Sequence, residues 1–91
     1  MTEIDIEEFG KQYKDKSFSE IMAIANNEDK KGSAELFFIE IIKCGKNLED
    51  ADKEFLEISE KIIESLLDNS KVIDKDLLLY LGRINNGLKK Y

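Results

Sequence analysis

Residues 47–68 read NLEDADKEFLEISEKIIESLLD, the longest amphipathic stretch of the chain. Its apolar side chains recur in steps of three and four, the spacing of one face of an α-helix, at Leu48, Ala51, Phe55, Ile58, Ile62 and Leu66. Asn47 stands just before this pattern, and its side chain can accept a hydrogen bond from a backbone N–H of the first turn. The stretch therefore predicts one long helix over residues 48–68, capped by Asn47, that buries a single apolar face.

Cap signals mark the starts of other helices. Asp5 is followed after three residues by Glu8, and Ser17 in the same way by Glu20, which is the pattern of a capping box. Apolar residues then recur at helical spacing in each segment. Gly45 tolerates a left-handed backbone and is expected to end the third helix. The expected helices besides 48–68 cover residues 5–13, 18–25, 33–44 and a C-terminal segment that begins near Asp74.

The fold class follows from these helices together with what the sequence lacks. The chain has no proline, and no segment alternates apolar and polar residues with the period of a strand. Its 91 residues are one domain's worth of chain, with no linker and no internal repeat. We therefore expect a single all-α domain over residues 1–91, built as a compact bundle of four to five helices.

The segment Leu36–Cys44 is apolar almost all round, and its outer side is marked only by Glu35, Glu40 and Lys43. A helix of this kind is typically the buried centre of a bundle, so we expect this one to be the most buried. Phe37 and Phe38 point about 100° apart on a helix, so at most one of them can face the deepest core.

Two glycines fall inside the C-terminal helical pattern. In a helix interior, Gly82 and Gly87 each cost about 1 kcal/mol relative to alanine. One interpretation is that the helix frays near Asn85–Gly87. The other is that Gly82 lets a neighbouring helix pack closely. The sequence favours neither.

The net charge of −6 is concentrated in residues 47–68. This segment holds eight of the twenty acids and two of the fourteen bases, so the rest of the chain holds twelve of each. One interpretation is a solvated face with i, i+4 ion pairs such as Glu49–Lys53 and Glu57–Lys61. The other is an acidic docking surface that attracts a basic partner, with the candidate partner-binding residues Asp50, Glu54, Glu57, Glu60, Glu64 and Asp68.

Groups for catalysis and metal binding are scarce. The chain has no histidine, which removes the commonest general base and metal ligand. Its one cysteine, Cys44, ends an apolar segment, where a buried thiol is inert. Residues 27–32 begin like a calcium loop, but Lys31 and Phe38 stand where oxygen ligands are needed. We therefore expect no enzyme, no catalytic residue, no cofactor and no metal site.

Charge and hydropathy also bear on partners and compartment. The acidic balance argues against direct binding of nucleic acid, and no apolar run is long enough to span a membrane. The N-terminal residues lack the basic and apolar regions of a secretory signal. We therefore expect a cytoplasmic protein whose partner is another protein.

Two function classes fit a small acidic helical domain of this kind. The first is a non-catalytic binding protein that docks on a basic surface of a partner and neutralises or regulates it, as immunity proteins, antitoxins and anti-defence inhibitors do. The alternative is a self-assembling helical adaptor or structural module, in which the apolar excess of Leu36–Ile42 forms a contact between identical chains. In either class, further candidates for contact hot spots are Tyr13, Tyr80 and Tyr91.

Overall fold

The computed structural model describes residues 4–30, 32–69 and 74–91, and every regular element within these ranges is a helix. The predicted all-α bundle of four to five helices is confirmed. The elements are α1 (Ile6–Gln12), α2 (Phe18–Ala25), α3 (Ser33–Cys44), α4 (Lys53–Asn69) and α5 (Lys75–Leu88), with two short 3-10 helices, η1 (Glu28–Lys30) and η2 (Gly45–Asp50). The apolar link Val72–Ile73 expected between the last two helices lies outside the described residues.

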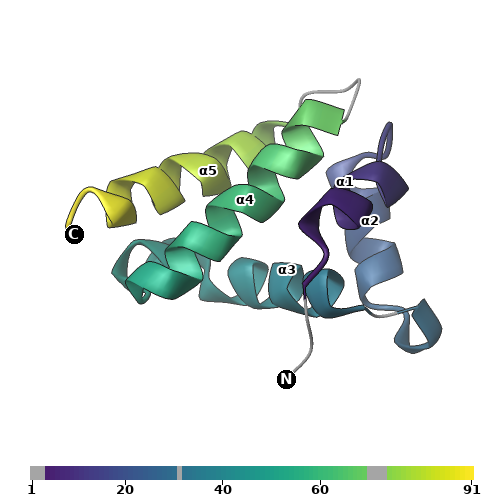
Figure 1. Cartoon of the computed structure of the whole chain (residues 1–91), viewed down its shortest axis with the longest axis horizontal. Coiled ribbons are helices and arrows are strands. Elements are labelled where there is room, and N and C mark those ends of the chain that lie inside the picture. The colour runs from purple at the N-terminus through teal and green to yellow at the C-terminus, as the bar shows by residue number, and fades with distance from the viewer. Residues whose placement is uncertain (1–3, 31, 70–73) are drawn as a thin grey trace.

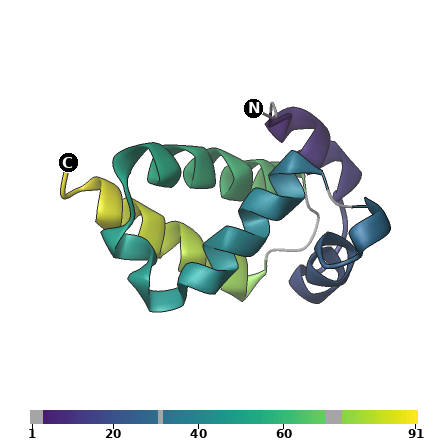
Figure 2. The ribbon, with the colours of Figure 1, turned by 90° about the horizontal axis from the view of Figure 1, so that it is seen from below.

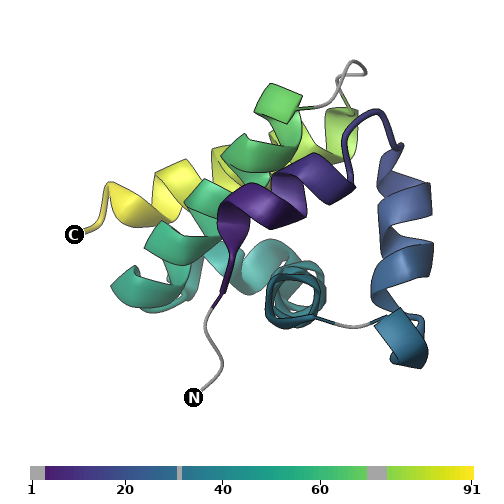
Figure 3. The ribbon, with the colours of Figure 1, turned by 45° about the vertical axis from the view of Figure 1, so that its right-hand side comes forward.

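Helix α4 runs through the middle of the molecule (Figure 1). Helix α5 lies along one side of α4 and α1 along another, while α3 crosses beneath them (Figure 2). Helix α2 stands at the end of the molecule away from the C-terminus and contacts α3 (Figure 3). The principal extents are 35 × 31 × 20 Å, so the helices form a flattened bundle around α4.

The core is built mainly around α4. Leu56, Ile62, Ile63 and Leu66 of this helix are buried, as their helical spacing predicts. They join one apolar cluster with side chains from the other helices, which include Phe9, Ile21, Phe38, Ile41, Leu48, Leu77 and Ile84. A continuous cluster of this kind supplies most of the free energy that holds a small domain together.

As predicted, α3 is the most enclosed of the described helices, with five of its twelve residues buried and only Leu36, Glu40 and Lys43 exposed. Phe38 and Ile41 are buried in the core, but Leu36 is 48% exposed and Phe37 is only partly buried. The exposed residues Leu36, Glu40 and Lys43 are spaced by four and three residues, so the open part of α3 is one narrow stripe. The two adjacent phenylalanines divide as helical geometry requires, with Phe38 in the core and Phe37 nearer the surface.

Both predicted N-caps are confirmed. The backbone N–H of Glu8 donates to Asp5 Oδ1 at 2.9 Å, and that of Glu20 donates to Ser17 Oγ at 3.2 Å. These bonds satisfy N–H groups that a helix start otherwise leaves without a partner. The starts of α1 and α2 are therefore fixed locally, by residues within one turn of each other.

Asp74 caps α5 and also connects it to α2. Its Oδ1 accepts a hydrogen bond from the backbone N–H of Asp76 at 2.9 Å. Its Oδ2 accepts one from the backbone N–H of Phe18 at 2.8 Å. One carboxylate therefore satisfies the first turns of two helices that lie far apart in the sequence.

The start of the fourth helix differs from its prediction. Residues 45–50 form η2, Ala51 is extended, and α4 begins only at Lys53, so Asn47 is not its cap. Leu48 is buried, and η2 packs against α5. The apolar spacing continues through Leu48 and Ala51, which is why the sequence resembles one helix. Burial of Leu48 against a distant helix overrides that local pattern.

The two glycines of α5 have opposite surroundings, and neither sequence interpretation is correct. The helix continues to Leu88 without fraying at residues 85–87. A Cβ atom at Gly82 would have no atom within 4 Å, so no close packing occurs there. At Gly87 a Cβ atom would lie 2.8 Å from the carbonyl oxygen of Glu49 and 2.9 Å from Leu56 Cδ1. Close approach of α5 therefore requires glycine at position 87 and not at position 82.

We expect Gly87→Ala to lower the free energy of unfolding by about 1–3 kcal/mol, because the η2 backbone must shift to admit the methyl group. Gly82→Ala is the matched control, and it should raise stability by about 1 kcal/mol through helix propensity alone. Urea denaturation of both variants measures the two effects. Equal effects of the same sign would show that the packing of α5 on η2 is misplaced.

The adjacent residues Ile41 and Ile42 test how α3 is oriented in the bundle. Ile41 is fully buried, so Ile41→Ala should cost about 2–5 kcal/mol. Ile42 is only partly buried, so Ile42→Ala should cost about 1 kcal/mol. Thermal or urea unfolding distinguishes the two variants. A loss below about 0.5 kcal/mol at Ile41 would place that residue at the surface instead.

Candidate partner-binding surface

Four acidic side chains share the exposed side of α4. Glu54, Glu57, Glu64 and Asp68 are all exposed, and we call these four residues the acidic face. Glu57, Glu64 and Asp68 are spaced by seven and four residues, so they lie nearly in line along the helix, interrupted by the exposed Lys61. The apolar side of α4 is buried beneath them, which fixes the direction in which the acids point.

The two lysines of α4 do not neutralise the acidic face by direct contact. Among the described residues, neither Lys53 nor Lys61 forms an ion pair within 4.0 Å. The i, i+4 pairs Glu49–Lys53 and Glu57–Lys61, which the solvated-face interpretation expects, are therefore not formed. With five acids and two bases from residue 53 to residue 68, this helix carries a net charge of −3.

Asp50 is separated from the other predicted partner-binding residues. It lies in η2, not on α4, and its Oδ1 forms an ion pair with Lys90 Nζ at 3.1 Å. Its neighbour Glu49 accepts a hydrogen bond from Asn86 Nδ2 at 3.3 Å. Acids of η2 thus contact the end of α5. Asp50 therefore does not share a helix with the other five candidate residues, because Ala51 is extended and α4 begins only at Lys53.

Glu60 is partly buried and lies on the flank of α4, between the acidic face and the core side. Of the six predicted residues, the structure therefore brings together four on one exposed strip. It places Glu60 beside that strip and Asp50 outside it.

An apolar depression lies next to the acidic face, between α3 and α4. The rings of Phe37 and Phe55 stack in it, with centroids 4.7 Å apart and planes at 25°. Ile58 completes the apolar lining, and Asp52 and Glu54 form the rim. Both acids are exposed. This depression has a volume of about 270 Å³.

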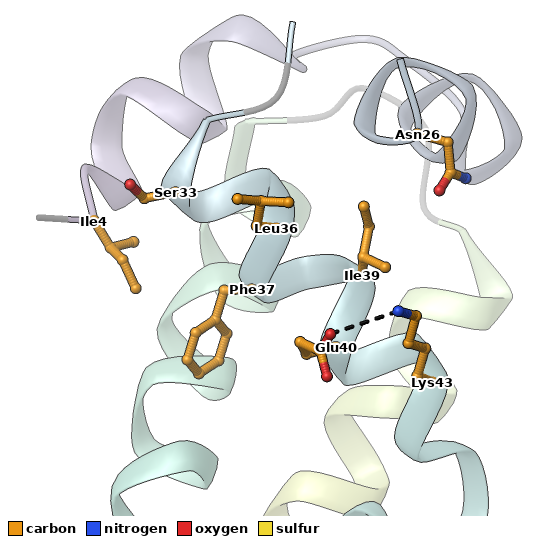
Figure 4. Close-up of a pocket in the computed structure, with 8 residues that line it drawn as sticks. All are labelled: Ile4, Asn26, Ser33, Leu36, Phe37, Ile39, Glu40 and Lys43. Carbon is orange, nitrogen blue, oxygen red and sulfur yellow. Dashed lines mark ion pairs between the residues drawn. The ribbon is translucent and has the colours of Figure 1, made fainter. Parts of the chain in front are cut away.

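A second depression, of about 540 Å³, lies along the outer side of α3 (Figure 4). Phe37 lines both depressions, so they meet at this ring. The second one is lined by Ile4, Leu36 and Ile39 and bordered by an ion pair between Lys43 Nζ and Glu40 Oε1 at 3.6 Å. The sequence indicates Leu36–Ile42 as a candidate contact segment, but a uniformly apolar segment does not reveal which of its sides stays open.

Glu35 is buried, although the sequence interpretation placed it on the outer side of α3. Tyr13 Oη donates a hydrogen bond of 2.7 Å to Glu35 Oε1, and both residues are nearly inaccessible. Burial, this hydrogen bond and the negative charge of Glu35 raise the pKa of Tyr13, so its hydroxyl keeps the proton it donates. The buried carboxyl is stable here because it has a partner. Tyr13 is therefore not available as a contact hot spot.

The other two tyrosines are nearer the surface. Tyr80 is partly buried, its ring stacks on Phe18 with centroids 6.1 Å apart, and the Arg83 guanidinium carbon lies 5.5 Å from the ring centroid. Tyr91 is exposed, and its hydroxyl donates to the carbonyl oxygen of Ala51 at 2.9 Å. Both rings already have intramolecular contacts.

Within the described ranges, no group of three or more acidic or cysteine side chains is arranged to hold a metal ion. Cys44 is partly buried and packs against the core. None of the described helices has the length and hydropathy needed to cross a membrane.

Comparisons with protein-family models, with curated proteins and with solved structures found no match to this chain. The functional assignment therefore depends on the surface of this chain itself.

Proposed function

We propose that this is a small non-catalytic binding protein. It docks through the acidic face of α4 on a basic surface of a partner protein and thereby neutralises or regulates that partner. Immunity proteins, antitoxins and anti-defence inhibitors act in this general way. The observation that carries the proposal is the exposed strip of Glu54, Glu57, Glu64 and Asp68, without an ion pair to the lysines of its own helix.

The physical basis is long-range attraction. A strip that is predominantly of one charge raises the local concentration of an oppositely charged partner and speeds its association. Proteins that act on nucleic acids carry basic clefts, and an acidic helix can occupy such a cleft. A helix also presents its charges on a rigid element, so little side-chain or backbone ordering is needed on binding.

The surroundings of the acidic face favour docking over mere solvation. Interfaces typically have an apolar, aromatic centre and a polar rim. The stacked pair Phe37–Phe55 lies beside Glu54, at the border of the acidic face. A solvated face needs no such neighbour.

Self-assembly into a helical adaptor is the second candidate. Its support is three exposed leucines, Leu36 at 48%, Leu78 at 46% and Leu79 at 50%. Sedimentation or light scattering across a hundredfold range of concentration distinguishes the candidates. We expect a monomer throughout, because a net charge of −6 opposes association of identical chains. A mass that doubles with concentration would favour the adaptor.

Capture from an extract of the native host tests the docking proposal. The bait is the wild-type chain, and the first variant carries Glu57→Lys, Glu64→Lys and Asp68→Lys. The matched control carries Glu7→Lys, Glu20→Lys and Glu28→Lys, three exposed acids on other elements. Each set of three reversals changes the net charge from −6 to zero.

The expected result is a protein retained by the wild type and by the control, released by salt, and not retained by the α4 variant. Equal retention by all three chains would assign binding to another surface. Equal loss in both variants would show that net charge alone attracts the partner.

A further inference from the structure

Two depressions share Phe37, the smaller one between α3 and α4 and the larger one along the outer side of α3. We call the two together the Phe37 groove and define it by its apolar floor and by the acidic rim at its α4 end. The floor is formed by Ile4, Leu36, Phe37, Phe55 and Ile58, and the rim by Asp52 and Glu54.

Part of the apolar floor is exposed to solvent, although burying it would be favourable. Phe37 is partly buried and lines both depressions, and Leu36 beside it is among the most exposed large apolar side chains described. Figure 4 shows both side chains projecting from α3 into the larger depression. Apolar side chains held together at a surface gain free energy when a partner covers them.

The charges at the two ends of the groove differ. At the α3 end Glu40 and Lys43 form an ion pair, so that end is neutral. At the α4 end Asp52 and Glu54 are exposed, and among the described residues their side chains form no hydrogen bond or ion pair. The groove therefore has an apolar floor and a net negative rim, and its complement is an apolar segment with positive charge at one side.

We infer that the Phe37 groove receives an amphipathic segment of the partner protein. Apolar side chains of this segment pack on Phe37 and Phe55, and its lysine or arginine side chains face Asp52 and Glu54. Amphipathic helices bind apolar grooves in this way, anchored by residues three and four positions apart. This inference rests on the proposed function and makes it more specific, because it names the chemistry of the partner segment.

A second copy of the chain is the competing occupant. The rim of the groove is acidic and so is the chain as a whole, so charge opposes this arrangement. The basic amphipathic segment is the occupant that the rim charge favours.

The test uses three synthetic peptides of about 15 residues, a length that spans about 22 Å as a helix. The first has leucine at helical spacing and lysine elsewhere. The second keeps the leucines and replaces lysine with glutamate. The third keeps the lysines and replaces leucine with serine. Each is titrated into the ¹⁵N-labelled full chain, and amide shifts locate the site.

We expect only the leucine–lysine peptide to bind tightly, with shifts centred on residues 36–40 and 52–58. Phe37→Ala should weaken this binding about tenfold, as loss of a central aromatic contact does. Leu36→Ser is a second variant at an exposed position that leaves the core intact, and it should also weaken binding. The Glu57, Glu64 and Asp68 reversal should change the affinity less than either variant.

Three results would overturn the inference. They are equal binding of the serine–lysine peptide, shifts centred on residues 64–68, and concentration-dependent shifts of the groove without peptide, which would indicate a second copy. If the peptide titration fails but the captured partner still binds in a salt-dependent way, the Phe37 groove is rejected and the proposed function is retained. If the leucine–lysine peptide binds the groove but the captured partner does not bind through the acidic face, the proposed function is rejected.

Discussion

Replacing Phe38 with alanine should lower the free energy of unfolding by about 3–5 kcal/mol. Its side chain is fully buried at the centre of an aromatic group, with ring centroids 6.0 Å from Phe9 and 6.0 Å from Phe18. The substitution removes contacts among α1, α2 and α3 together. Because small domains are stable by about 5–15 kcal/mol, this loss is a large share of the total free energy of unfolding.

Phe37→Ala is the matched control for that prediction. Phe37 is partly buried and stacks on one ring only, so its loss should cost about 1–2 kcal/mol. Urea denaturation monitored by circular dichroism gives both values. Equal losses, or a larger loss at Phe37, would mean that α3 is rotated from its position in the bundle.

The second large effect concerns binding. Reversal of Glu57, Glu64 and Asp68 to lysine should slow association with the partner about 10- to 100-fold at low salt, because the attraction becomes repulsion. The fold should survive with a change of about 0.5 kcal/mol or less, since all three side chains are exposed. The control reversal of Glu7, Glu20 and Glu28 should leave the association rate within about threefold of the wild type. Stopped-flow mixing with the captured partner measures these rates.

Local signals in the sequence predicted the elements that depend on neighbouring residues. The caps at Asp5 and Ser17 act within one turn, so their side-chain chemistry is sufficient to place α1 and α2. The start of α4 could not be predicted in this way. Leu48 is buried and η2 packs on α5, and helical spacing within one segment cannot report packing against a helix that is distant in the sequence.

For the candidate surface, too, the sequence predicted the features that depend on one helix and not those that depend on contacts between helices. Periodicity was sufficient to place Glu54, Glu57, Glu64 and Asp68 on one side of a helix, because that side is opposite the buried one. It could not predict that Phe37 meets Phe55, since this requires the crossing of α3 under α4. Nor could it predict that Glu35 is buried, because its partner Tyr13 belongs to another helix.

The most direct test of the acidic face is the association rate of the captured partner as a function of ionic strength. Salt screens charges beyond about 10 Å at 0.1 M, so a steered association slows as salt is added. For the wild type and the Glu7, Glu20 and Glu28 control, we predict a rate that falls steeply with ionic strength. For the Glu57, Glu64 and Asp68 reversal, we predict a slow rate that is flat or rises with salt. A reversal variant that associates at the wild-type rate at low salt, with the same salt dependence, would contradict docking through α4.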